Sequence, residues 1–193
     1  MYTVSVRVKG ISPLMQHRFP MPDYETTTKS GQVSTGEKKW HEEWREALYV
    51  DKDGEVFQPA THFESAMLKA ASSFKIRGKR GKTYKDLFAM AVIVSPDEIP
   101  HNVKMPDTLT TDADEQLYID QRPVKIQKAR VVRTRPTFKT GWELEFEIQV
   151  SDDELQSDVV YEVLSMAGKS VGIGDYRPRF GRFQVVSFEV LKG

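Results

Sequence analysis

The segment from Gly172 to Phe183 combines residue types that suit binding of a phosphate backbone and stacking of bases. We call it the glycine-arginine loop, and its glycine, arginine and aromatic residues are Gly172, Gly174, Gly181, Arg177, Arg179, Arg182, Tyr176, Phe180 and Phe183. Glycine lets a partner approach the main chain, the arginine fork matches phosphate geometry, and a ring offers a stacking face. The loop precedes a β-like run, so one interpretation is a cradle for a nucleic acid strand. The alternative is an irregular loop whose rings pack on the core and whose arginines are solvated.

Two further basic clusters could extend such a track. Residues 75–85 hold six basic residues and no acid, and residues 122–139 hold seven and no acid. Single-stranded nucleic acid is bound by a cationic groove interleaved with aromatic platforms. We therefore expect one surface to be lined by the loop together with Lys79, Arg80, Arg130, Arg133 and Arg135. The alternative is that these clusters form a solvated face.

The overall charge does not mark the protein as a nucleic-acid binder. The chain has 193 residues, with 28 basic and 28 acidic residues and a net charge of zero, which argues against binding by bulk charge alone. The acids gather at 37–64, 97–120 and 143–162. Segregated charge on a neutral chain fits a basic groove, or a protomer whose acidic side meets its neighbour's basic side.

Several classes of site and location are disfavoured. The chain has no cysteine, and its four histidines lack zinc-ligand spacing, so we expect no metal and no cofactor. No apolar run reaches the roughly 20 residues that span a bilayer, and the N-terminus lacks the pattern of a signal peptide. We expect a cytoplasmic protein with no membrane contact.

The hydrophobic periodicity predicts alternating strands and helices. The expected core strands and helices are 2–9, 61–74, 124–135, 142–150, 152–167 and 182–191. The helices at 61–74 and 152–167 begin with apparent capping boxes, whose residues are Thr61 with Glu64 and Ser151 with Glu154. Gly168 is expected to close the second helix, and the strands at 124–135 and 142–150 are expected to form a hairpin.

The remaining stretches predict two long insertions, near 14–56 and 75–123. A helix is expected over 37–49, and a buried strand over 87–94 that has no assigned place in the core. The core order is strand, helix, two strands, helix, strand, which is the βαββαβ order of the ferredoxin-like fold shared by RNA-recognition domains. The prediction is an α+β protein in which residues 1–193 form a single domain on a ferredoxin-like/RRM-like core.

Three stretches resemble the RAMP superfamily, the RRM-like proteins that form the backbone and processing subunits of CRISPR effector complexes. The glycine-arginine loop is similar to the family's glycine-rich signature, residues 57–67 to the element that leads into its first helix, and residues 8–14 to its first strand and following loop. Two departures are Thr61-His62 in place of the usual glycine, and the acid Asp175 inside the loop.

The resemblance to backbone subunits implies a non-catalytic protein that coats single-stranded guide RNA. Its implied partners are copies of itself and other effector subunits. The insertions would then contact neighbours and the strand. The alternatives from the residues and the family are a metal-independent endoribonuclease, a phage-encoded protein that binds single-stranded DNA, or a purely structural subunit.

Two residues are the candidates for catalysis that the resemblance brings forward. His62, in the first turn of the expected helix, could serve as a general acid or base like the histidine of the family's processing ribonucleases. Asp23 resembles the acid with which some backbone subunits assist metal-dependent cleavage. The alternatives are a surface histidine and a loop acid, and we expect the protein to bind rather than to cleave.

Overall fold

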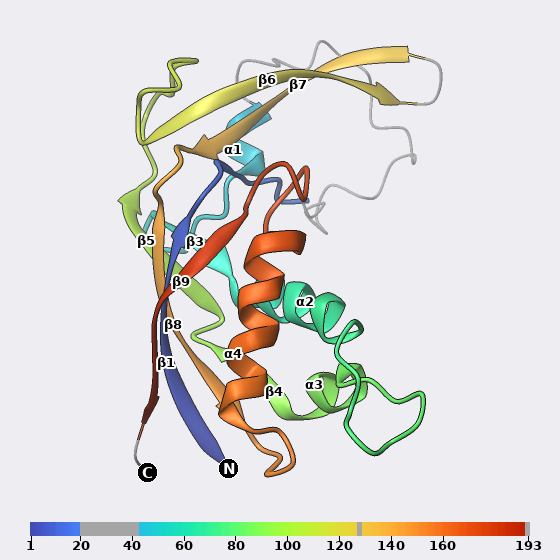
Figure 1. The fold of residues 1–193 in the computed structure, drawn as a ribbon. Helices are drawn as coiled ribbons and strands as arrows, with labels where there is room; N and C mark the ends of the chain where they lie inside the picture. Colours follow the sequence, from blue (N-terminus) through green and yellow to red (C-terminus); the bar gives the residue numbers. More distant parts are fainter. Residues whose placement is uncertain (20–42, 127–128, 192–193) are drawn as a thin grey trace, which may run out of the picture.

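The computed structural model describes residues 1–19, 43–126 and 129–191 (Figure 1). Its centre is an antiparallel four-stranded sheet in the order β4-β8-β1-β9. These strands are β1 (Tyr2–Gly10), β4 (Val92–Ser95), β8 (Glu143–Val150) and β9 (Phe183–Leu191). Helices α2 (Ala60–Ala71) and α4 (Ser157–Met166) lie against one face of the sheet. The predicted α+β class is therefore confirmed.

The two central strands of the sheet have one buried and one exposed face. Their helix-facing side chains are buried and pair as Val4 with Ile148, Val6 with Phe146, and Val8 with Leu144. The intervening glutamates of β8 are exposed. This alternation has the period of two that a strand imposes on its side chains, and the strands predicted at 2–9 and 142–150 are confirmed.

Phe63 of α2 lies at the centre of the core. Its side chain is fully buried, and its ring centroid lies 4.3 Å from that of Phe146 on β8 and 5.5 Å from that of Phe183 on β9. Tilted ring pairs at such separations add to the stabilisation from buried area. This cluster packs α2 against the sheet beside Phe183, the residue at which the glycine-arginine loop ends and β9 begins.

The apolar stretch predicted as one buried strand at 87–94 is a helix followed by a strand. Helix α3 (Lys85–Ala91) buries Phe88 and Ala91 and exposes Met90, and the chain then enters β4. A continuous apolar run has no period that separates a helix from a strand. The difference changes the topology, because the strand after α3 is β4, which pairs with β8 as an outer strand of the central sheet.

The hairpin predicted between 124–135 and 142–150 is wrong. Strand β6 (Leu117–Ile126) pairs with β7 (Ala129–Phe138) along its whole length, whereas β8 lies between β1 and β4. Because β6 and β7 are so close in sequence, pairing them costs little chain entropy. The acidic run and prolines before residue 120 conceal the first strand of this pair in the sequence.

Within the described residues, two smaller sheets lie beside the central one. Strand β2 (Leu14–Met15) extends the β6–β7 hairpin, and β3 (Glu55–Pro59) pairs with β5 (Glu98–Lys104). Figure 1 shows the hairpin at the end of the molecule remote from both termini. The helix expected over 37–49 is present as α1 (Glu43–Ala47), and residues 37–42 lie outside the described part of the chain.

Both predicted capping boxes are wrong. Helix α2 begins after Pro59 without a side-chain cap, and the carboxylate of Glu64 instead accepts a hydrogen bond from Val94 N at 3.0 Å. Helix α4 begins after Gln156, and Ser151 donates to the carbonyl of Ala91. Both polar groups are used by β4 or the segment before it, so tertiary pairing takes the place of local capping.

The end of α4 also differs from the prediction. Gly168 does not close the helix, because the chain continues as a π-helical turn η1 (Ala167–Val171), and this turn ends at Gly172 with φ of 76°.

Within the described residues, no helix has the length and apolar character needed to cross a membrane.

We expect Phe63→Ala to lower the free energy of unfolding by about 3–5 kcal/mol, because it opens a cavity between two rings that cannot fully collapse. Denaturant unfolding measures the change. Val186→Ala on exposed β9 is the control and should change stability by less than about 0.5 kcal/mol. Equal effects of the two substitutions would contradict the assigned core.

Candidate nucleic-acid interface

The glycine-arginine loop has a defined backbone that starts where η1 ends. Gly172 N donates to Ala167 O at 2.8 Å, and Ile173 N donates to Gly181 O at 2.9 Å, which closes the base of the loop. Tyr176 adopts a positive φ of 57° at the turn. These bonds hold the intervening residues as one compact excursion between α4 and β9.

The loop is attached to the segment that follows β1. Asp175 N donates to Met15 O at 2.8 Å and Gly181 N to Pro13 O at 2.7 Å. A Cβ atom on Gly174 would overlap the carbonyl of Met15, and one on Gly181 would overlap that of Ile173. At both positions φ is also 72°, a conformation that favours glycine. The approaching backbone here is the protein's own.

The exposed part of the loop is basic. Arg177, Arg179 and Arg182 are exposed, as is Tyr176, whereas Phe180 and Phe183 are buried. The structure therefore separates the three predicted stacking residues into one surface ring and two core rings. The arginine side chains remain available on the surface, as the cradle interpretation requires.

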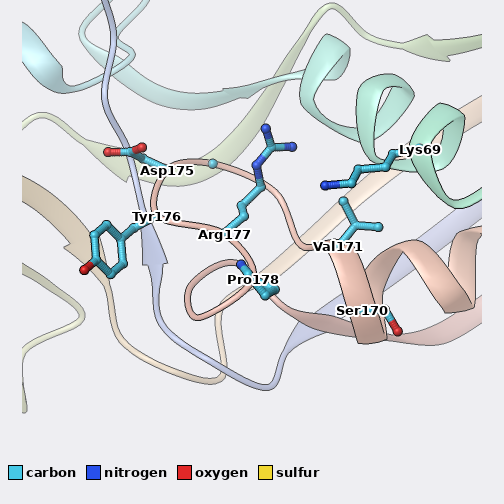
Figure 2. A pocket seen from close by; sticks show the side chains of 8 residues that line it. Lys69, Ser170, Val171, Asp175, Tyr176, Arg177 and Pro178 are labelled. Atoms are coloured by element: carbon cyan, nitrogen blue, oxygen red, sulfur yellow. The ribbon is translucent and has the colours of Figure 1, made fainter.

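A pocket of about 430 Å³ lies between the loop, η1 and α2 (Figure 2). Its lining includes Arg177 and Tyr176 from the loop, Ser170 from η1 and Lys69 from α2. The sequence reasoning missed Lys69 and Ser170. The available signal for Lys69 was its spacing of two helical turns from His62, which places both residues on one face of α2.

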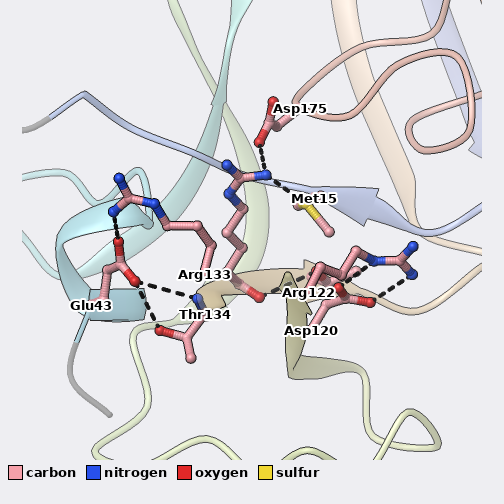
Figure 3. A network of polar contacts seen from close by, with 9 residues as sticks. Met15, Glu43, Asp120, Arg122, Arg133, Thr134 and Asp175 are labelled. Atoms are coloured by element: carbon pink, nitrogen blue, oxygen red, sulfur yellow. Dashed lines mark hydrogen bonds and ion pairs between the residues drawn. The ribbon is translucent and has the colours of Figure 1, made fainter. Parts of the chain in front are cut away.

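Asp175, the acid that fits a phosphate site least, forms an ion pair with Arg135. Asp175 Oδ2 and Arg135 Nη1 lie 2.6 Å apart, and Arg135 is largely buried (Figure 3). Arg133 likewise forms an ion pair with Glu43 of α1. The structure thus places these two predicted binding arginines against acids, where they join the hairpin to the loop and to α1.

Arg122 of β6 makes a second contact between the hairpin and the loop. Its guanidinium carbon lies 4.6 Å from the ring centre of Phe180 and 5.5 Å from that of Tyr176. The same group pairs with Asp120, at 2.5 Å from Nε to Oδ1. Such cation–π contacts are favourable when partly shielded from water. The sequence reasoning did not single out Arg122, because the strand that carries it was not recognised.

Two of the remaining predicted binding residues, Lys79 and Arg80, lie on a different part of the molecule. Lys79 forms an ion pair of 2.7 Å with Glu154, which precedes α4, whereas the glycine-arginine loop follows the other end of that helix. Fifteen helical residues at about 1.5 Å each separate the two ends by roughly 20 Å. Arg80 is in the same loop as Lys79. The side chain of Arg130, and all of Asp23, lie outside the described part of the chain.

His62 lies on the edge of this region in a setting that keeps it neutral. Its Nδ1 contacts the side-chain amide of Gln58, and its ring packs edge-on against Tyr49. Desolvation by burial, with a smaller contribution from the Arg177 charge, lowers its pKa to about 4. With Gln58 donating to Nδ1, the ring proton is on Nε2. A neutral imidazole in this tautomer has little acid–base capacity near pH 7.

The polar chain behind His62 continues into the protein. Gln58 Oε1 accepts from Gln16 Nε2 at 3.1 Å, and Gln16 Oε1 accepts from Tyr49 N at 3.0 Å. This chain connects β3, α2 and the segment after β2. Among the described residues, no group of histidines and acids could hold a metal ion.

We expect Gly174→Ala to destabilise the protein more than Gly141→Ala by about 1–3 kcal/mol. Both positions have positive φ, so both substitutions cost backbone strain, but a Cβ atom meets nothing within 4 Å at Gly141. The difference in unfolding free energy isolates the contact with Met15. Equal losses would show that the loop does not pack as closely as described.

We expect acid to destabilise the protein through His62. Its folded pKa lies below its unfolded value, so the unfolded state binds the extra proton first, and stability falls as pH drops from about 6.5 to 4. Unfolding free energies of wild type and His62→Gln measure this term. The variant should lose about 3 kcal/mol less over that range, and parallel pH curves would contradict the assignment.

The sequence matches no family model and no curated protein. The fold is similar to solved structures, among them a chain in the cryo-EM structure of the Type III-B Cmr-beta bound to cognate target RNA. The TM-score is 0.56 at 11% sequence identity, over 99% of this chain. The chain spans 61% of that neighbour's length. At this identity the likeness is one of fold.

Proposed function

We propose that this protein binds single-stranded RNA through the exposed face of the glycine-arginine loop, as a non-catalytic subunit of a CRISPR-type ribonucleoprotein. The observation that carries the proposal is a set of exposed cations on the loop, Arg177, Arg179 and Arg182, of which Arg177 lines the pocket together with Lys69 of α2. Cations around an exposed aromatic ring are the elements of a single-strand site.

The architecture supports the RAMP-type assignment at the level of the fold. We propose that the core is ferredoxin-like, with β1, β4, β8 and β9 as its four strands and α2 and α4 as its two helices. The sheet order and the chain order of these elements agree with a βαββαβ unit. The likeness to a chain from a structure that contains cognate target RNA supports the choice of ligand.

The open face of the sheet is a poor alternative site for RNA. RNA-recognition domains stack bases on aromatic residues of this face. Here the exposed positions of β8 are Glu143, Glu145 and Glu147, and those of β1 include Arg7 and Lys9, with no aromatic residue among them. Carboxylates repel phosphate, so we assign the RNA to the loop side.

The loop can present its cations without its own acid cancelling them. Asp175 lines the same pocket as Lys69 and Arg177, but its carboxylate is paired with Arg135 of the hairpin. One phosphate could therefore contact these two cations while a base stacks on Tyr176. Catalysis has no corresponding support, since His62 is neutral and its Nδ1 is occupied.

The test measures binding of a short labelled RNA across a range of salt concentrations. We expect the variant Arg177→Ala/Arg179→Ala/Arg182→Ala to bind at least about tenfold more weakly. Its slope of log affinity against log salt should decrease by about two, since each phosphate contact on a single strand contributes roughly 0.7. The RNA should be recovered intact in EDTA.

The matched control is Arg77→Ala/Arg80→Ala/Lys82→Ala. It removes the same number of positive charges from the loop 75–85, whose Lys79 pairs with Glu154 near the opposite end of α4. It should retain most of the affinity. Equal binding by wild type and the loop variant would refute the proposal. Stronger binding to DNA of the same sequence would instead identify a single-stranded DNA-binding protein.

A further inference from the structure

One face of the β6–β7 hairpin carries three arginines, and each of them is paired with an acid. In the register of the two strands, Arg122 lies opposite Arg133, and Asp120 lies opposite Arg135. Alternate residues of a strand and their direct cross-strand partners share a face, so these four side chains are neighbours. Arg133 and Arg135 pair with acids of α1 and of the glycine-arginine loop, and Asp120 pairs with Arg122 (Figure 3).

The Asp120–Arg122 pair has two parallel hydrogen bonds. Arg122 Nε donates to Asp120 Oδ1 at 2.5 Å, and Arg122 Nη2 donates to Asp120 Oδ2 at 3.0 Å. Exposed ion pairs contribute little, but here only 12% of the Asp120 side chain and 33% of the Arg122 side chain is exposed. Two bonds to one carboxylate fix the plane of the guanidinium as well as its position.

The guanidinium that Asp120 holds lies between two rings of the glycine-arginine loop. Its carbon is 4.6 Å from the ring centre of Phe180 and 5.5 Å from that of Tyr176, and the two rings are 5.9 Å apart at an angle of 79°. Phe180 is buried, whereas Tyr176 is 46% exposed. Two neighbours therefore hold the Tyr176 ring, and nearly half of that residue is left exposed.

We propose that Asp120, although it is an acid, strengthens the binding of RNA, because it orients Arg122 and thereby fixes Tyr176 as a stacking platform. The inference rests on the proposed function, since it assigns a positioning residue to the same site. A base that shares the ring with the guanidinium meets a side chain that is already ordered, so stacking costs less side-chain entropy. Neither Asp120 nor Arg122 needs to contact a phosphate.

This role of Asp120 is opposite in sign to the effect of its charge. A carboxylate repels the phosphates of a strand, so neutralising Asp120 should strengthen binding if attraction between charges is all that matters. If Asp120 acts by positioning, neutralising it should weaken binding, although the protein gains one unit of positive charge. Asp120→Asn keeps the shape of the side chain, so the sign of its effect separates the two roles.

The affinity of Asp120→Asn for the short labelled RNA tests the inference. We expect binding to be at least about threefold weaker than that of wild type. Arg122→Ala and Arg122→Lys should show a similar loss, because lysine keeps the charge but lacks the planar fork. The slope of log affinity against log salt should change by less than the roughly 0.7 that one phosphate contact contributes.

Lys9→Ala is the control. It also removes a strand residue from an ion pair, with Glu143, but on the open face of the central sheet, and it should bind RNA as wild type does. Melting temperatures check that every variant is folded at the temperature of the assay. If Asp120→Asn is not folded, Arg122→Lys answers the same question, since it too separates position from charge.

Tyr176→Ala shows whether Asp120 acts through this ring. Alone it should weaken binding at least about fivefold. In that background Asp120→Asn should cause no further loss, because there is no ring left to hold. An oligonucleotide of equal length in which every nucleotide lacks its base gives a second readout. Asp120→Asn should bind this ligand at least as tightly as wild type does.

Three results would overturn the inference: Asp120→Asn binding RNA as tightly as wild type or more tightly, losses from Asp120→Asn and Tyr176→Ala that simply add, or an equal loss of affinity for the base-free ligand. The variant Arg177→Ala/Arg179→Ala/Arg182→Ala separates the two proposals. If it binds RNA as wild type does, the proposed function fails and this inference fails with it. If it loses affinity while Asp120→Asn does not, only the inference fails.

Discussion

The close backbone contact between the glycine-arginine loop and the segment after β1 is the constraint on which the arrangement of the site depends. Two amides of the loop, at Asp175 and Gly181, donate to carbonyls of Met15 and Pro13. Glycine at 174 makes room for the carbonyl of Met15, and glycine at 181 makes room for the carbonyl of Ile173 within the loop. Because β2 follows directly and pairs with β7, the same contact brings the hairpin next to the loop. Sheet, loop and hairpin therefore meet at one place.

The charged residues of this neutral chain have different structural roles. Some arginines are used to hold elements together, as Arg133 does with Glu43 and Arg135 with Asp175. Others stay on the surface, and the acids of β8 are on the far side of the sheet. A count of charges in the sequence cannot separate these groups, because pairing depends on which strands are neighbours. The net charge therefore says little about which surfaces are basic or acidic, because that depends on where each charged residue lies in the fold.

The sequence predicted correctly the elements that have a local hydrophobic pattern. It did not predict the elements whose structure depends on contacts with residues distant in the sequence. Strand 2–9 and the alternating strand at 142–150 have a clear period, and both are present. The apolar run at 87–94 has no period, and the acids before residue 120 obscure β6, so the second core strand was assigned to the wrong segment. Glu64 and Ser151 matched capping boxes, yet both side chains bond to groups at or beside β4. The exposed arginines of the loop were identified from the sequence. Lys69 and Arg122 could be identified only once the packing of α2 and of the hairpin against the loop was known.

The Asp175–Arg135 pair and the contact of Arg122 with Phe180 and Tyr176 have a kinetic consequence. They hold the loop in its shape in the free protein, so the proposed binding of RNA would have little backbone ordering entropy to overcome. Under that proposal, encounter would not wait for a conformational change, and its rate would be set by diffusion and by attraction between the arginines and the phosphates. Tyr176 already has a guanidinium near its ring, so a base that stacks there would have to share or replace that neighbour. The resulting complex would form quickly, and differences between sequences would appear in how long it lasts.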